Sequence, residues 1–227
     1  MNRQVIFFAI WFASALRVPA GVIDIEPQRG RAVPSIKWVD DTGRVRRLSD
    51  FAGYPLVLLP VYTRCRTACV ANADQLKKAL AQSTADPTQF RVMLFSFDPG
   101  DTPAVLATYR QRENLPLGWS VGTASAQEVD ALLDALGLQA AKAGSEFMHS
   151  NMVVFLDADL RIAKWIYGTD YSTRDIDAAL QVAAGRNDWI GQHAQWLYAI
   201  ALFSASMLCV VLINYLLQLR RALGVAG

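Results

Sequence analysis

Hydrophobic and polar positions divide the chain into two apolar ends and a central region where short apolar runs alternate with helical patterns. Residues 56–62 and 90–97 are nearly continuous apolar runs of the kind that is typical of buried strands. Between them, apolar side chains recur at helical spacing and define one face at Cys69, Ala73, Leu76 and Leu80. Pro60 lies inside the first strand and cannot donate to a sheet ladder, so a bulge or a local break is predicted there.

Two further stretches have the alternation and turn residues of hairpins. A turn at 41–43 joins the short alternating runs of 37–48, and a turn at 157–159 joins strands at 151–156 and 161–167. Because such turns are tight, the strands that each one joins must be antiparallel.

Three more helices are predicted from their caps and periodicity. One runs from Pro103 to about residue 114 with Thr102 as its N-cap, and one from 125 to 136 ends at Gly137, which can adopt the left-handed cap conformation. The last spans 173–184. Strands separated by helices indicate an α/β fold, in the order of a thioredoxin-like mixed sheet flanked by helices.

The N-terminus has the pattern of a secretory signal. Arg3 precedes an apolar run over 5–16, and small residues follow at 18–20, where a signal peptidase could cleave. This run is shorter than the roughly 20 residues that a membrane-spanning helix needs, so residues 1–20 are interpreted as a signal peptide.

The C-terminus has the pattern of a membrane anchor. Residues 196–219 contain no charged side chain, and as a helix they would extend about 36 Å at 1.5 Å per residue. Trp196 and Tyr198 stand at the start of this span, where aromatic rings favour the headgroup region, and Arg220 and Arg221 follow its end. The sequence therefore predicts a C-terminal transmembrane helix with the arginines in the cytoplasm.

Signal and anchor together predict the organisation of the whole chain. A thioredoxin-like domain occupies 21–184, a juxtamembrane linker 185–195, the transmembrane helix 196–219 and a cytoplasmic tail 220–227. In a bacterium, this arrangement gives a single-pass inner-membrane protein whose domain faces the oxidising periplasm.

Charge argues against one class of partner. The 22 Lys and Arg residues nearly balance the 20 Asp and Glu residues, which leaves a net charge of +2. Nucleic-acid binding needs a pronounced basic surface, so nucleic acid is not expected as a partner.

Two of the three cysteines lie where a strand is followed by a helix. Cys65 and Cys69 are separated by one helical turn, close enough to oxidise together or to bind one metal ion. The start of a helix presents free N–H groups that stabilise a thiolate. A purely structural disulfide is less typical, because such bonds usually close longer loops. Cys209 lies inside the apolar C-terminal span, where cysteine packs as a small hydrophobe.

His149 is the candidate third ligand. It precedes the strand at 151–156 and is expected in a loop that leads toward the centre of the sheet. Two thiolates and one imidazole are a suitable ligand set for copper(I), although a histidine at such a place is commonly structural. The other histidine, His193, lies beside the predicted membrane span, where an interfacial role is expected.

Four blocks of sequence, in order, resemble the Sco/SenC family: Leu48-Ser49-Asp50-Phe51-Ala52-Gly53, Tyr62-Thr63-Arg64-Cys65 with Cys69, Phe97-Asp98-Pro99-Gly100-Asp101-Thr102-Pro103, and His149-Ser150 before Phe155-Leu156-Asp157-Ala158-Asp159. The resemblance covers most of the central domain. It implies a thioredoxin-like fold, copper held by Cys65, Cys69 and His149, and assembly of the binuclear copper centre of cytochrome oxidase, with its copper-bearing subunit as partner.

Two functions use the same side chains. The first is a copper chaperone, as the resemblance implies. The second is a thiol-disulfide oxidoreductase in which Cys65 attacks a partner disulfide, Cys69 resolves the mixed disulfide and His149 acts as an acid, a base or an orienting group. A peroxiredoxin-type peroxidase is disfavoured because Pro60, Thr63 and Cys65 are too closely spaced for its motif.

The acidic loop before the predicted helix at Pro103 also has two interpretations. Asp98 and Asp101 could contribute to partner docking. Alternatively, Asp101 and Thr102 serve only as caps of that helix.

Overall fold

The apolar run at 56–62, predicted as a buried strand, is an interior strand of the sheet in a computed structural model, which describes residues 28–143, 146–185 and 189–222. This strand, β3 (Leu56–Val61), pairs in parallel with β4 (Arg91–Ser96) on one side and antiparallel with β8 (Met152–Leu156) on the other. The complete sheet has seven strands in the order β2-β1-β5-β4-β3-β8-β9. The other four strands are β1 (Lys37–Asp40), β2 (Val45–Arg47), β5 (Ser120–Thr123) and β9 (Ile162–Tyr167).

The mixed sheet and both predicted hairpins are confirmed. β1 and β2 pair antiparallel around the turn at 41–43, and β8 and β9 pair antiparallel around the turn at 157–159. A short 3₁₀ helix, η2 (Leu48–Phe51), follows the first hairpin.

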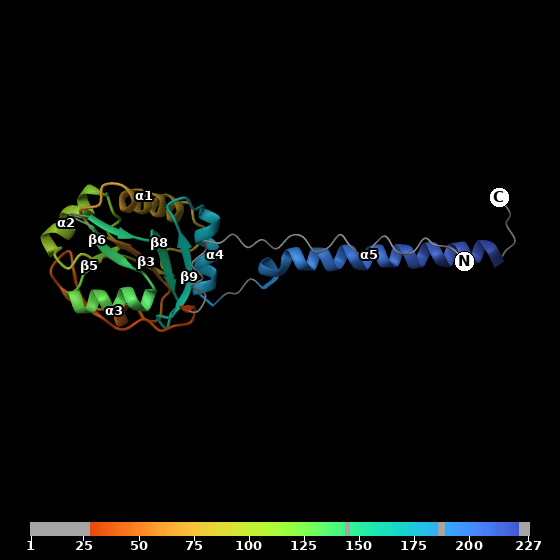
Figure 1. The fold of residues 1–227 in the computed structure, drawn as a ribbon, viewed down its shortest axis with the longest axis horizontal. Coiled ribbons are helices and arrows are strands. Elements are labelled where there is room, and N and C mark those ends of the chain that lie inside the picture. The colour runs from red at the N-terminus through yellow and green to blue at the C-terminus, as the bar shows by residue number, and fades with distance from the viewer. Residues whose placement is uncertain (1–27, 144–145, 186–188, 223–227) are drawn as a thin grey trace.

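The predicted helices are present with the expected caps. They are α1 (Ala68–Ala81), α2 (Pro103–Arg112), α3 (Ala126–Leu136) and α4 (Thr173–Ala183). The Thr102 side chain accepts from the N–H of Val105 at the start of α2, and Gly137 ends α3 with a positive φ of 67°. Figure 1 shows α1 and α3 on opposite sides of the sheet.

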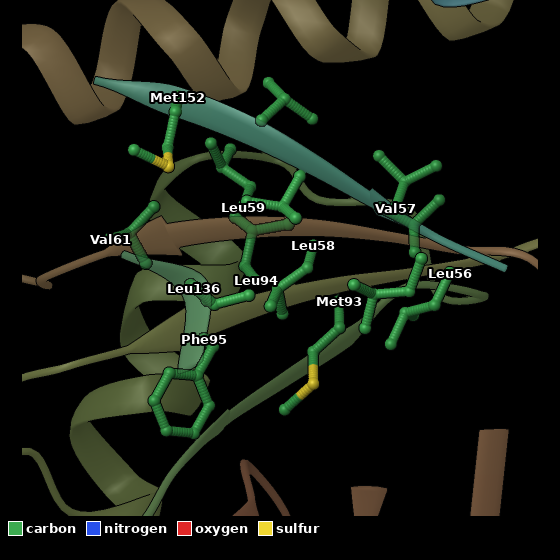
Figure 2. Packing of buried hydrophobic residues seen from close by; sticks show 14 of the residues in the cluster. Leu56, Val57, Leu58, Leu59, Val61, Met93, Leu94, Phe95, Leu136 and Met152 are labelled. Atoms are coloured by element: carbon green, nitrogen blue, oxygen red, sulfur yellow. The ribbon is translucent and has the colours of Figure 1, made fainter. Parts of the chain in front are cut away.

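The two central strands form the middle of the hydrophobic core. Leu56, Val57, Leu58 and Leu59 of β3 are fully buried, as are Met93, Leu94 and Phe95 of β4, and Figure 2 shows these side chains packed together. Burial of each large apolar side chain contributes about 1.5 to 3 kcal/mol. These strands therefore form a rigid platform for the loops at their carboxyl ends.

Of the two alternatives predicted at Pro60, the structure has the local break and not the bulge. Pro60 stands opposite Phe95 in an unbroken parallel register with β4. On the other side, the pairing with β8 ends at Leu58, two residues earlier. The strand thus accommodates a residue without an N–H because its second ladder stops before that residue is reached.

Three strands were not predicted. β5 contains Gly122, whose lack of a side chain leaves room for Trp38 of the neighbouring β1. β6 (Ala140–Ala143) and β7 (Glu146–His149) form a separate two-stranded antiparallel sheet in which Ala140 stands opposite His149. These strands are short and weakly apolar, so their local pattern carries little signal.

After the domain, one long helix, α5 (Trp189–Ala222), extends away from the sheet (Figure 1). Its segment Tyr198–Leu216 is long and apolar enough to cross a membrane, and Cys209 is exposed within it. Residues 189–195, predicted as linker, are helical. The predicted signal peptide, residues 1–20, and residues 223–227 of the predicted tail lie outside the described part of the chain.

Candidate metal and thiol site

The loop between β3 and α1 holds Cys65 at the start of a helix. The N–H of Cys65 donates to the carbonyl of Tyr62 (3.1 Å), and the N–H of Cys69 donates to Cys65 Sγ (3.3 Å). Thr67, at the N-cap position of α1, makes no side-chain cap. The sulfur of Cys65 therefore satisfies one of the free N–H groups that the first turn of α1 presents.

The two cysteines are chemically unequal. Burial alone would raise the pKa of Cys65, but hydrogen bonds from the backbone N–H groups of Cys69 and Thr67 outweigh it and lower that pKa below its usual value. Burial raises the pKa of Cys69 far above its usual value, and the neighbouring Cys65 adds to the effect. Cys65 is thus the more acidic thiol of the pair and Cys69 the less acidic one.

His149 reaches the cysteines from a distant part of the sequence. Its Nε2 lies 3.7 Å from Cys69 Sγ, and its Nδ1 lies 3.1 Å from the carbonyl oxygen of Ser150. A carbonyl can only accept, so in the neutral ring Nδ1 carries the proton and the lone pair of Nε2 faces the sulfur. Burial lowers the pKa of His149 below its usual value, which favours this neutral form.

The expectation that His149 lies in a loop is wrong, because it is the last residue of β7. Its ring packs edge-on against Phe97, with the centroids 4.8 Å apart, and against Tyr62, with the centroids 5.9 Å apart. Phe147, two residues earlier on the same face of β7, contacts the same two rings. This aromatic cluster fixes the direction of the imidazole.

An open pocket of about 540 Å³ adjoins these residues and gives access to them from solvent. Its walls come from residues around the start of α1, from β7 and from neighbouring segments: Tyr62, Cys65, Thr67, Ala68, Gln139, Ala141, Phe147, Met148, His149, Ser150 and Asn151. Within the described ranges, no three His, Cys, Asp or Glu side chains are already gathered as a metal-binding group. Cys65 and His149 line this pocket, and Cys69 lies behind it, in contact with Cys65 through its N–H and with His149 through its sulfur.

A buried carboxylate anchors the loop that carries Cys65. Asp101 accepts from the N–H (3.3 Å) and the hydroxyl (2.7 Å) of Thr63 and from the hydroxyl of Ser96 (2.5 Å), while Arg112 donates to the carbonyl of Thr63 (2.8 Å). Hydrogen bonds to a charged group contribute about 1.5 to 3 kcal/mol each.

The prediction that Asp101 caps α2 is wrong, because its carboxylate accepts from Thr63 and Ser96 instead. Only Thr102 caps α2, and no local pattern could reveal a contact between residues this far apart.

Asp98 has a different role in the same loop. Its carboxylate pairs with the guanidinium of Arg64 and also accepts from the N–H of Gly100 (3.0 Å). The Asp98 side chain is largely buried, whereas that of Arg64 is 58% exposed. This ion pair ties the residue before Cys65 to the loop after β4.

Comparison with known proteins shows the family of the chain. A protein-family model described as SCO1/SenC matches residues 26–184 of the chain. It belongs to the SCO1/SenC family. The matched range of this SCO1/SenC protein includes Cys65, Cys69 and His149, and the resemblance drawn from its sequence blocks is confirmed.

Solved structures of other proteins share the fold of this SCO1/SenC domain. An Aquifex aeolicus protein described as an electron transfer protein is 33% identical, with a TM-score of 0.68 over 71% of this chain and 97% of its own. Copper-bound ScoI of Bradyrhizobium japonicum is 17% identical, with a TM-score of 0.58 over 66% and 98%.

A third structure is that of BsSco, which is described as having a disulfide switch and as a member of the Sco family of cytochrome c oxidase assembly proteins. It is 21% identical, with a TM-score of 0.58 over 68% of this chain and 94% of its own. A search of curated proteins found no match.

Proposed function

We propose that this SCO1/SenC protein is a membrane-anchored copper(I) chaperone that binds its cargo through Cys65, Cys69 and His149. It delivers the ion to the copper-bearing subunit of cytochrome oxidase or to another copper protein. The observation that carries the proposal is the contact between Cys69 Sγ and the unprotonated Nε2 of His149, which joins the thiol pair to a third donor.

The donor set suits copper(I) better than competing ions. Two thiolates and a neutral imidazole carry a charge of −2, and soft sulfur ligands favour copper(I) over hard cations such as magnesium or calcium. Zinc prefers four ligands in a tetrahedron, so three protein donors would leave its coordination open. Relatives with the same fold have been solved with copper bound, which supports the assignment.

The first expected result is a stoichiometry. The reduced full-length protein in detergent should bind one copper(I) per chain when titrated anaerobically against a chelator of known affinity. Cys65→Ser and Cys69→Ser should each weaken binding by more than about 100-fold, because loss of a ligand exceeds the 10- to 100-fold cost of a change around the ligands. Cys209→Ser, the matched control in α5, should bind as the wild type does. Unchanged affinity in both domain variants contradicts the proposed site.

A second candidate function rests on the inequality of the thiols. The Cys65 thiolate attacks one sulfur of a partner disulfide, and the other partner sulfur leaves as a thiolate. Cys69 then loses its proton and attacks the Cys65 sulfur, so the partner becomes a dithiol and Cys65 and Cys69 become a disulfide. The lowered pKa of Cys65 favours this order of attack. BsSco has a disulfide switch, which is consistent with redox chemistry on this fold.

The proposal includes a location. The domain faces the periplasm of a bacterium and α5 crosses the inner membrane once, with the C-terminus in the cytoplasm, as Arg220 and Arg221 after the apolar span indicate. Alkaline phosphatase, which is active only when exported, should be inactive when fused after Gly227. The same enzyme inserted after Asn187, between α4 and α5, is the matched control and should be active. The reverse pattern would invert the topology.

A further inference from the structure

Apart from the sulfur of Cys65 itself, the pocket has uncharged walls in the part that the structure describes. Its described lining residues are aromatic, aliphatic or polar and include no Asp, Glu, Lys or Arg. A partner segment that enters this pocket is therefore not selected by the charge of these walls.

Two exposed arginines flank Cys65, which lines the pocket, in the sequence. Arg66 lies between Cys65 and Thr67, which both line the pocket, and it is exposed. Arg64, on the other side of Cys65, is 58% exposed although it pairs with Asp98. Because Asp98 offsets the charge of Arg64, Arg66 is the main source of net positive charge among the two arginines that flank Cys65.

We infer that Arg64 and Arg66 form a basic rim that selects partners whose target cysteine lies in an acidic segment of chain. The inference rests on the proposed function, since a partner sulfur must approach Cys65 in both copper transfer and thiol exchange. Opposite charge around a cleft raises the rate of encounter by about 10- to 1,000-fold, and the effect falls as ionic strength rises. Like charge on the partner has the opposite effect.

The test uses the reduced full-length protein in detergent and three short peptides. Each peptide has one cysteine, flanked by glutamate, serine or lysine, and carries 2-nitro-5-thiobenzoate on that cysteine as a mixed disulfide. The Cys65 thiolate attacks the peptide sulfur, a new disulfide forms between Cys65 and the peptide, and 2-nitro-5-thiobenzoate leaves with the electron pair as the better leaving group. Its absorbance reports the rate.

At about 10 mM ionic strength, where charges act over about 30 Å, the glutamate peptide should react at least about 10-fold faster than the lysine peptide. The difference should disappear near 1 M salt, where charges act over about 3 Å. Arg66→Glu should reduce the preference to less than about 3-fold at low salt or reverse it.

The control is Arg44→Glu, which makes the same change in net charge. Arg44 is an exposed residue in the turn between β1 and β2, and two strands, β5 and β4, separate that hairpin from β3. This variant should keep the wild-type preference. Equal rates for all three peptides, an equal loss in both variants, or no reaction with any peptide overturns the inference. The proposed copper site is judged separately by its stoichiometry, which does not depend on these rates.

Discussion

Replacement of His149 by alanine is expected to weaken copper(I) binding by more than about 100-fold while both thiols remain available. The imidazole presents the lone pair of Nε2 to Cys69 Sγ at 3.7 Å. The Nδ1–H of His149 donates to the carbonyl of Ser150, which fixes the orientation of the ring. The loss of copper affinity on removing a direct ligand should exceed the 10- to 100-fold loss that follows when the groups around a ligand are altered. Competition with a copper(I) chelator under anaerobic conditions measures the change.

The lower affinity should reflect loss of the ligand and not misfolding of the domain. The ring of His149 also contacts Phe97 and Tyr62, and an aromatic contact of this kind contributes about 0.5 to 1.5 kcal/mol, so the domain should remain folded. His193→Ala, which changes the only other histidine of the chain, should bind copper as the wild type does. If His149→Ala keeps wild-type affinity and still reduces disulfides, the thiol-disulfide oxidoreductase becomes the better account.

Gly122→Ala is expected to have the largest effect on stability. A Cβ at this position would lie 2.3 Å and 2.6 Å from two ring carbons of Trp38 and 2.9 Å from the carbonyl oxygen of Val39. Trp38 cannot move aside easily, because it is 1% exposed and stacked on Phe51. Overpacking of a core costs about 1 to 3 kcal/mol and occasionally more, and here backbone must also shift, so a loss of at least about 3 kcal/mol is expected.

Thermal unfolding followed by circular dichroism measures this loss. Gly118→Ala is the matched control, because a Cβ at Gly118 would meet no atom within 4 Å. It should change the free energy of unfolding by no more than about 0.5 kcal/mol. A Gly122→Ala protein as stable as the Gly118→Ala protein would contradict the packing of β5 against Trp38.

The parts of the fold that follow from local pattern were predictable. β3 and β4 are continuous apolar runs because both of their faces are buried, where helices cover the sheet. Thr102 and Gly137 mark the ends of helices, because a threonine side chain can cap an N-terminus and glycine can adopt a positive φ. The strand β5 was not predictable, because Gly122 is required by the bulk of Trp38 on another strand and gives no strand signal of its own.

The candidate site divides in the same way. The positions of Cys65 and Cys69 at the start of α1 follow from the sequence, since a strand and a helix with their own periodicity flank them. The hydrogen bonds of Asp101 to Thr63 and Ser96 could not be predicted, because they depend on how the loops after β3 and β4 meet. The sequence indicated His149 as a candidate ligand. Its position on the strand β7 could not be predicted, because that strand forms only by pairing with β6.

X-ray absorption spectroscopy of the copper(I)-loaded protein tests the central claim most directly, because it counts the atoms bound to the ion. The proposed site predicts two sulfur neighbours and one nitrogen neighbour in the wild type, and loss of the nitrogen in His149→Ala. Two sulfur neighbours without nitrogen in the wild type, or a nitrogen neighbour that persists in His149→Ala, would contradict a site formed by Cys65, Cys69 and His149.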